Sequence, residues 1–355
     1  MRHASGINLT GVTAFNGGGS ALSAIKLEMP DVVMLGVPDV DSDEMILFEK
    51  IRDHLPQLPV ILLSPRSRRG AEAALCGLRM GAVDFITKPD QRNGLILATR
   101  HFTKRVYPVI RAIPRLNHGR IGQLNKHGPI GKQGRKIDDL VSSSDWSASL
   151  EYDIISIIGC MGAIPSLFDL ISTLPARLPV PIIVVQHMPK YYTDELARQL
   201  DEVTSLHVRE AKNNSLLLPG QVYVAPGGRH AVVRPDGSRR IINLHRGVKI
   251  NRCRPSADMF LKSATQAYSG RVLSLFLSGG GDDGIDGAKE VLNAGGDIIL
   301  EDYRSAILGD LVGDVSMVDD DLPYYRAGDL GHEIIKRLNG DWKMQATRMQ
   351  IDHHT

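Results

Sequence analysis

The chain has 355 residues, of which 43% are hydrophobic, and its formal net charge is +2. This length predicts two domains, each with its own core, and the near-neutral charge gives no reason to expect nucleic acid or a membrane surface as a partner. No apolar run approaches the ~20 residues of a membrane span, and the first residues do not read as a signal peptide. Cys76, Cys160 and Cys253 lack paired spacing, which predicts a cytoplasmic protein without a zinc site, and no cofactor is expected.

The first domain is expected to span residues 1–107. Short aliphatic runs at 32–35, 60–63 and 82–86 predict strands, and the apolar positions of residues 71–80 predict a helix between the last two. Alternating strands and helices indicate a parallel α/β sheet.

A basic linker is expected at residues 108–150. Between Pro108 and Ile137 it holds seven Lys or Arg residues and no acidic residue, and it shows little hydrophobic periodicity. A solvated connector is the favoured interpretation, and a docking segment for an anionic partner is the alternative. Residues 341–355 are expected to form a frayed tail.

The second domain, residues 151–340, again alternates strands and helices. Strands are predicted at 154–158, 180–185, 222–224 and 273–277, a hairpin at 231–244, and a helix at 255–268. The expected fold is a doubly wound parallel sheet, in which functional residues gather at the carboxyl ends of the strands.

Three of these strand ends carry the chemistry. Ile154–Ile158 is followed by Gly159-Cys160-Met161-Gly162, the next strand is followed by His187, and Leu273–Leu277 is followed by a glycine-rich loop that contains Asp283. A Ser-His-Asp hydrolase needs a nucleophile, a base and a carboxylate from such positions. The base and the carboxylate are present, and Met161 stands where the nucleophile is expected. Structural roles compete with this interpretation, because Asp283 also suits a helix N-cap.

Other motifs are weaker. The spacing Gly279-x-Gly281-x-x-Gly284 matches a dinucleotide fingerprint, but Asp282 and Asp283 would repel a pyrophosphate. Residues 39–44 begin like a calcium loop but lack its glycine and its final glutamate, so no calcium site is expected. The pair His353-His354 is read as part of a solvated tail, so no metal ligands are predicted.

With these residues in view, the chain resembles the chemotaxis response regulators of the protein-glutamate methylesterase (CheB) family. The resemblance rests on Gln186-His187-Met188-Pro189, Tyr223–Gly228, Arg254–Asp258 and Ser278–Gly284, and in the first domain on Gly81–Pro89. It implies a flavodoxin-like receiver domain joined to a methylesterase domain. It also implies hydrolysis of glutamate methyl esters and deamidation of glutamines on chemoreceptors, with His187 as the base and Asp283 as its orienting carboxylate.

Against the family pattern, the functional positions are altered. The serine position is Met161, and a thioether forms no acyl-ester intermediate. Cys160, one residue earlier, is an alternative nucleophile, although a packed thiol is the simpler reading. The phosphate-accepting position of the receiver is Gly36, while Lys88 and Ser64 match the lysine and hydroxyl that contact the phosphate. The first receiver strand and helix are expected to be missing, so the receiver would be incomplete.

The favoured hypothesis is therefore a degenerate, inactive methylesterase homologue that still docks on chemoreceptors. The alternatives are residual or Cys160-based esterase activity, or a non-catalytic binding module that uses the sheet edge. Expected partners are chemoreceptors and, in addition, a chemotaxis kinase. We expect a cytoplasmic monomer.

Overall fold

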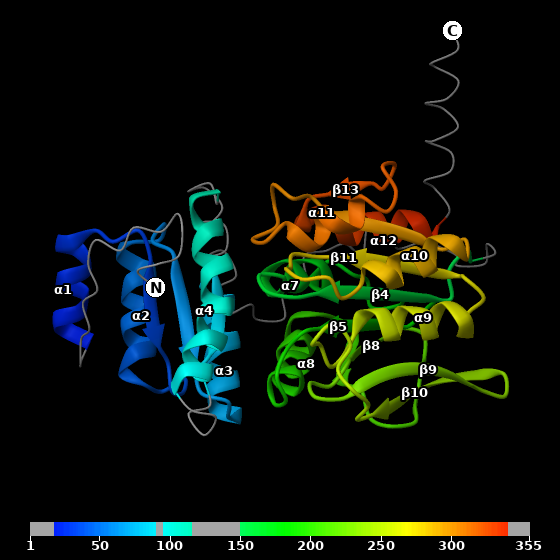
Figure 1. Cartoon of the computed structure of the whole chain (residues 1–355), viewed down its shortest axis with the longest axis horizontal. Coiled ribbons are helices and arrows are strands. Elements are labelled where there is room, and N and C mark those ends of the chain that lie inside the picture. Colours follow the sequence, from blue (N-terminus) through cyan, green and yellow to red (C-terminus); the bar gives the residue numbers. More distant parts are fainter. Residues whose placement is uncertain (1–17, 90–94, 116–149, 340–355) are drawn as a thin grey trace, which may run out of the picture. The chain divides into compact units, whose positions relative to one another are not determined.

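The computed structural model describes residues 18–89, 95–115 and 150–339. The chain divides into two compact units, residues 1–130 (unit 1) and 131–355 (unit 2), which are drawn in Figure 1. Within the described residues, no helix is both long and apolar enough to cross a membrane.

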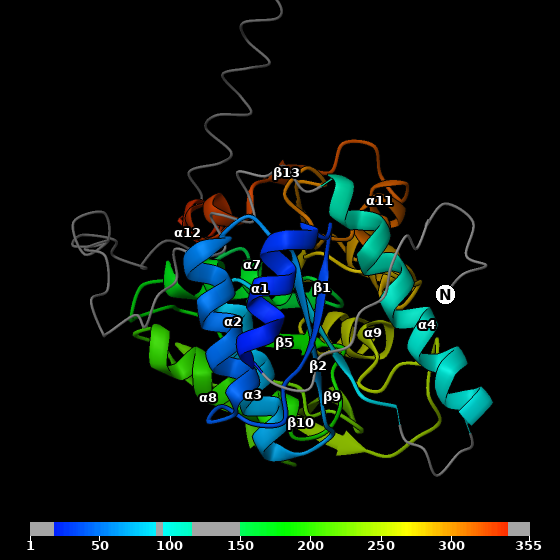
Figure 2. The same ribbon diagram turned by 90° about the vertical axis from the view of Figure 1, so that its left-hand side faces the viewer.

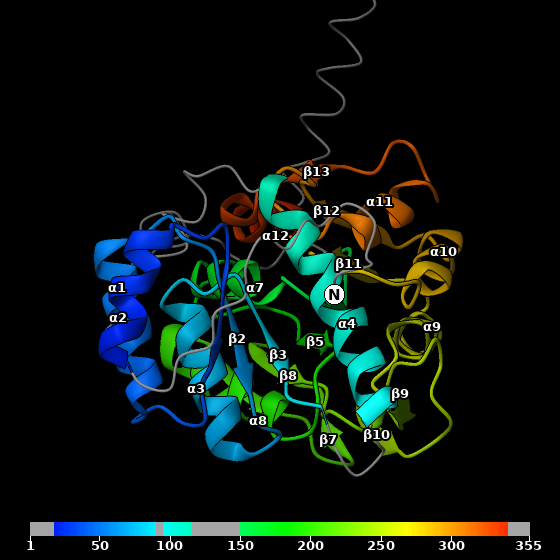
Figure 3. The same ribbon diagram turned by 60° about the vertical axis from the view of Figure 1, so that its left-hand side comes forward.

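Unit 1 contains a three-stranded parallel sheet in the order β1-β2-β3. Its strands are β1 (Val33–Gly36), β2 (Val60–Ser64) and β3 (Asp84–Thr87), close to the three predicted positions. Its helices are α1 (Gly18–Glu28), α2 (Asp43–His54), α3 (Arg68–Arg79) and α4 (Leu95–Ala112). Figures 2 and 3 show the strands between the α1–α2 pair and α4.

Local signals explain how α3 begins and packs. The Ser67 hydroxyl accepts a hydrogen bond from the Gly70 amide at 3.0 Å, which caps the helix. A Cβ at Gly77 would lie 2.2 Å from Cδ1 of Leu62, so a side chain there would displace Leu62 where α3 approaches β2. Most of the helix face predicted at residues 71–80 is buried accordingly.

The predicted start of the linker at residue 108 was wrong. Helix α4 continues through Pro108 to Ala112, and a 3₁₀ turn follows at Ile113–Arg115. A proline inside a helix removes one hydrogen bond, but Val106, Val109 and Ala112 are buried along the same stretch, and this packing keeps the helix intact. The rest of the predicted linker and the tail lie outside the described residues.

Unit 2 is built on a seven-stranded sheet in the order β13-β12-β11-β4-β5-β8-β6, and every pair of neighbours is parallel. The chain leaves β4 toward β5 on one side and later adds β12 beyond β11 on the other, so the sheet is doubly wound. The strands are β4 (Ile154–Gly159), β5 (Ile182–Gln186), β6 (His207–Glu210), β8 (Gln221–Val224), β11 (Val272–Phe276), β12 (Asp297–Glu301) and β13 (Tyr324–Tyr325).

A smaller antiparallel sheet in the order β7-β10-β9 contains the predicted hairpin. Its strands are β7 (Ser215–Leu216), β9 (His230–Asp236) and β10 (Arg239–His245). The turn falls at Gly237, where φ is +59° and glycine is favoured.

The helices of unit 2 are α7 (Ile164–Ser172), α8 (Tyr192–Val203), α9 (Ala257–Ala267), α10 (Ile285–Asn293), α11 (Asp310–Ser316) and α12 (Leu330–Leu338), with a 3₁₀ turn at Ala327–Asp329. Helix α9 begins at Ala257 rather than at Pro255, because Ser256 is its N-cap and accepts a hydrogen bond from the Met259 amide.

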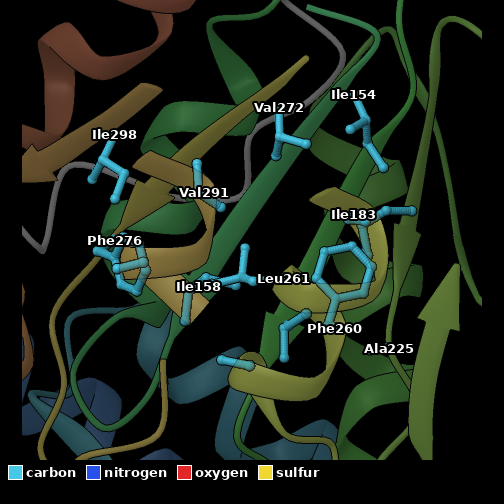
Figure 4. Close-up of a cluster of buried hydrophobic side chains, with 14 of the residues drawn as sticks. Ile154, Ile158, Ile183, Ala225, Phe260, Leu261, Val272, Phe276, Val291 and Ile298 are labelled. Carbon is cyan, nitrogen blue, oxygen red and sulfur yellow. The ribbon is translucent and has the colours of Figure 1, made fainter. Parts of the chain in front are cut away.

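The core of unit 2 fixes the edge of the sheet where the predicted site residues lie. Phe260 and Leu261 of α9 and Val291 of α10 belong to one buried cluster with Ile154 and Ile158 of β4 (Figure 4). Strand registers align Phe276 with Ile158, and Gly159 with Gln186. The residues that follow β4, β5 and β11 therefore emerge at one edge of the sheet.

Candidate active site

His187 and Asp283 lie together at this edge. His187 directly follows β5, and Asp283 lies in the loop between β11 and α10. Nε2 of His187 is 2.7 Å from Oδ2 of Asp283, and both side chains are largely buried. This is the hydrogen bond that a base and its orienting carboxylate require.

The carboxylate of Asp283 is held from several sides. It accepts hydrogen bonds from the Ser256 hydroxyl (2.7 Å), the Ala257 amide (2.7 Å) and the Asp258 amide (3.4 Å). These amides belong to the first turn of α9, so Asp283 caps a helix that is distant in sequence as well as orienting His187. The competing role as an N-cap is therefore real, but it concerns α9 and not the helix that follows Asp283.

Asp258 caps the other helix, α10, in the same way. Its Oδ1 accepts hydrogen bonds from the Gly284 amide at 2.9 Å and the Gly287 amide at 2.7 Å, at the start of α10. The two aspartates thus cap each other's helices. Burial and the neighbouring Asp283 raise the pKa of Asp258, although the two amides oppose this shift. This reciprocal arrangement ties the loop of Asp283 firmly to α9.

Electrostatics favour an ion pair between the imidazole and the carboxylate. Burial opposes the charged form of His187, but the interactions with Asp283, Cys160 and Cys253 together outweigh it and raise the pKa of His187 well above its usual value. Burial likewise opposes ionisation of Asp283, yet its bonds to His187 and Ser256 lower the pKa of Asp283. Both directions indicate a protonated imidazole beside a carboxylate.

The turn between β4 and α7 forms the third part of the site. A Cβ at Gly159 would lie 2.4 Å from Oε1 of Gln186 and 2.8 Å from Cβ of Ala163, so a side chain there would displace one of these residues. Gln186 also donates a hydrogen bond from Nε2 to the Cys160 carbonyl at 2.6 Å. The carbonyl of Met161 accepts a hydrogen bond from the Ser278 hydroxyl at 3.1 Å. The predicted turn is thus fastened to both neighbouring strand ends.

Cys160, the alternative nucleophile, interacts with His187. Burial alone would raise the pKa of its thiol, but a hydrogen bond with His187 lowers it, and the amides of Gly280 and Met161 act in the same direction. That Met161 faces His187 stays a prediction.

Sequence reasoning missed Cys253 in this site. Its sulfur also interacts with His187, and ligand atoms of His187, Cys253 and Asp283 lie within 4.8 Å of one another. Cys253 directly precedes the Arg254–Asp258 motif, but its spacing from the other site residues carried no signal. Ser256 and Asp258, which both donate hydrogen bonds to Asp283, were noticed only as part of that motif.

The positions predicted for phosphorylation lie in unit 1, apart from these residues along the chain. A Cβ at Gly36 would lie 3.6 Å from Nζ of Lys88, and the Lys88 amide donates a hydrogen bond to the Ser64 carbonyl at 2.8 Å. The three residues follow or end parallel strands and lie at one edge. Their roles in phosphate contact stay predictions.

Unit 2 is similar to known methylesterase domains. Residues 155–315 match the family model "CheB methylesterase". A similar solved structure is the catalytic domain of CheB methylesterase from Thermotoga maritima, with a TM-score of 0.50 and 33% identity, covering 52% of this chain and 98% of that one.

Two curated relatives extend the match over most of the chain, and both are protein-glutamate methylesterase/protein-glutamine glutaminases. The protein from Archaeoglobus fulgidus is 35% identical over 80% of this chain and 78% of its own length. The one from Trichodesmium erythraeum is 31% identical over 90% of this chain and 88% of its own length. The chain belongs to the CheB-type protein-glutamate methylesterase family.

Proposed function

We propose that this chain is a chemoreceptor-binding member of its family in which the serine route of methyl-ester hydrolysis is lost. The observation that carries the proposal is Met161 at the nucleophile position, in a site whose His187–Asp283 pair is otherwise intact. A thioether has no proton to give to the imidazole and forms no stable acyl intermediate. The chain keeps the His187–Asp283 pair, and it lacks the serine oxygen that would attack the ester.

Two nearby serines are poor substitutes, because their hydroxyls are already engaged. Ser256 donates its proton to Asp283 and accepts from the Met259 amide. Ser278 contacts the carbonyls of Met161 and Leu308 and accepts from the Leu308 amide. Freeing either hydroxyl would leave buried polar groups unsatisfied, at a cost of about 1–3 kcal/mol for each group.

A basic loop beside the site supports receptor binding. Arg246, Lys249 and Arg252 are exposed, and so is Val248, at 84% of its surface. The loop ends at Cys253, whose sulfur lies beside His187. The relatives are named for acting on protein glutamates, and glutamate-rich surfaces complement a basic loop. We assign this loop, residues 246–252, to contact with the chemoreceptor.

The contact between Cys160 and His187 favours a second candidate function, thiol-based hydrolysis. In this route His187 holds the thiol proton, and the Cys160 thiolate attacks the ester carbonyl. Methanol leaves with that proton, and a thioester forms. Water then attacks the thioester, giving the free glutamate carboxyl group and the restored thiol. Each bond broken is matched by a bond formed, so no further reactant is needed.

The experiment that tests both candidates uses the full chain and chemoreceptor in membranes, methylated with a radioactive methyl group. Co-sedimentation measures binding, and volatile methanol measures hydrolysis. The proposal predicts saturable binding with no methanol release above a chain-free control. Methanol release that disappears in Cys160→Ala, with binding retained, would establish the thiol route instead. Cys76→Ala, in unit 1, serves as the matched control.

We further propose that unit 1 is a receiver-like module that is not switched by phosphate. Gly36 provides no acceptor beside Lys88, so regulation through a kinase would have to act by binding alone. The working form we propose is a monomer in the cytoplasm.

A further inference from the structure

The side chains of His187, Cys253 and Asp283 form a compact group of donor atoms in unit 2. One potential ligand atom from each residue lies within 4.8 Å of the other two. A nitrogen, a sulfur and a carboxylate oxygen converge from the end of β5, the loop before α9 and the loop after β11. We propose that these three side chains bind a divalent transition-metal ion of the zinc class.

The donor types select the metal. A thiolate and an imidazole favour Zn²⁺, Co²⁺, Ni²⁺ or Cu²⁺ over Mg²⁺ and Ca²⁺, which prefer all-oxygen sites. Three protein ligands with a fourth position left to water or another ligand is an arrangement found in zinc sites. Tetrahedral bonds of about 2.0–2.3 Å place neighbouring ligand atoms roughly 3.3–3.8 Å apart. Nε2 of His187 and Oδ2 of Asp283, now 2.7 Å apart, need to separate by about 0.6–1.1 Å.

Charge balance supports the binding of a divalent ion at this site. A dication with one thiolate and one carboxylate is neutral, which suits a largely buried position beside the exposed basic residues Lys249 and Arg252. The ion would take the place of the proton that now joins His187 to Asp283. It would also occupy the imidazole that the Cys160 route needs as a base.

The surrounding hydrogen bonds hold two of the ligands in place. Asp283 is oriented by the Ser256 hydroxyl and the Ala257 amide, as ligating carboxylates are in metalloproteins. Cys253 closes a tight turn, in which its amide donates to the Ile250 carbonyl at 2.7 Å. Asn251 and Arg252 have φ values of +47° and +63°, a left-handed conformation that is uncommon outside glycine. Such local strain is typical of positions fixed for function.

Cobalt binding to the full-length chain tests the proposal. His353→Ala and His354→Ala are introduced first, so that the terminal histidines do not bind the metal. Co²⁺ is then titrated into reduced, metal-free protein, and the sulfur-to-cobalt charge-transfer absorption is recorded. We expect one equivalent to bind with this absorption, and Zn²⁺ to displace it.

Cys253→Ser should abolish the absorption and weaken binding at least about tenfold, and His187→Ala should weaken it similarly. Cys76→Ser and Cys160→Ser should retain the absorption, and thermal melting in the absence of metal checks that each variant folds. A wild-type chain without the absorption, or an absorption that survives Cys253→Ser and is lost with Cys160→Ser, overturns the proposal. Receptor binding is measured separately without metal, so failure of the metal site leaves the proposed function untouched.

Discussion

Nε2 of His187 lies 2.7 Å from Oδ2 of Asp283, although the two residues are 96 positions apart in the sequence. The pair is assembled by two strands of the doubly wound sheet and by the reciprocal capping of α9 and α10. The capping hydrogen bonds give Asp283 a structural role beside its orienting one. Asp283 therefore contributes to folding as well as to the site.

The first prediction concerns stability. Asp283→Ala removes the acceptor of the Ser256 hydroxyl and of two α9 amides, and leaves His187 without its partner. We expect the free energy of unfolding of unit 2 to fall by about 3–5 kcal/mol, as when one member of a buried pair is removed. Urea denaturation measures this change. The matched control is Asp286→Ala, because Asp286 is exposed and its ion pair with Lys289 contributes less than about 1 kcal/mol. Equal effects of the two substitutions would rule out the capping role.

The second prediction concerns the basic loop. Lys249→Glu with Arg252→Glu should weaken binding to chemoreceptor membranes about tenfold, or 1.4 kcal/mol, and reduce its dependence on salt. Co-sedimentation at several ionic strengths measures both effects. Arg234→Glu with Arg239→Glu is the matched control, since these exposed arginines lie near the turn of the β9–β10 hairpin. A greater loss in the control would place the receptor contact there instead.

The third prediction concerns phosphorylation of unit 1. Gly36 lies beside Lys88 without a carboxylate, so acetyl phosphate should leave no label on the protein. Asp39 is the nearest candidate for a substitute acceptor, but its side chain accepts a hydrogen bond from the Asp41 amide in the turn before α2. Intact-mass measurement after acetyl phosphate treatment tests this. Label that is lost in Asp39→Asn and kept in Asp41→Asn would show that the module is phosphorylated after all.

The fourth prediction concerns repair of the nucleophile. Met161→Ser should raise methanol release less than about tenfold, far below the ~10⁶ in kcat that a triad serine contributes in a serine protease. Cys160 interacts with His187, so a hydroxyl at residue 161 would compete with this thiol for the imidazole. Single-turnover assays with methylated receptor measure the gain. A gain of several orders of magnitude would show that Met161 alone separates this chain from an active enzyme.

The sequence could predict the parallel strands and the residues at their ends. Buried strands such as Ile154–Gly159 and Ile182–Gln186 read as largely aliphatic runs, and parallel topology brings their carboxyl ends together. The short strands β6, β7 and β13 carry mixed residues and depend on their neighbours, so no local pattern marks them.

Other features depend on tertiary packing. Helix α4 passes through Pro108 because the residues around it are buried, which local propensity cannot show. The closeness of Cys253 to His187 depends on the turn at residues 250–253. The exchange of caps between Asp258 and Asp283 depends on how α9 and α10 pack. These relationships join segments with no regular spacing, and only the folded chain reveals them.

The central claim is that this family member keeps the scaffold and has lost serine-route hydrolysis. The most direct measurement is methanol release from methyl-labelled chemoreceptor at a chain concentration that saturates binding, with a metal chelator present. The account predicts full binding and no release above the chain-free control, in the wild type and in Cys160→Ala alike. Robust release by the wild type that persists in Cys160→Ala would contradict it. Hydrolysis would then occur despite Met161 at the serine position and without the Cys160 thiol.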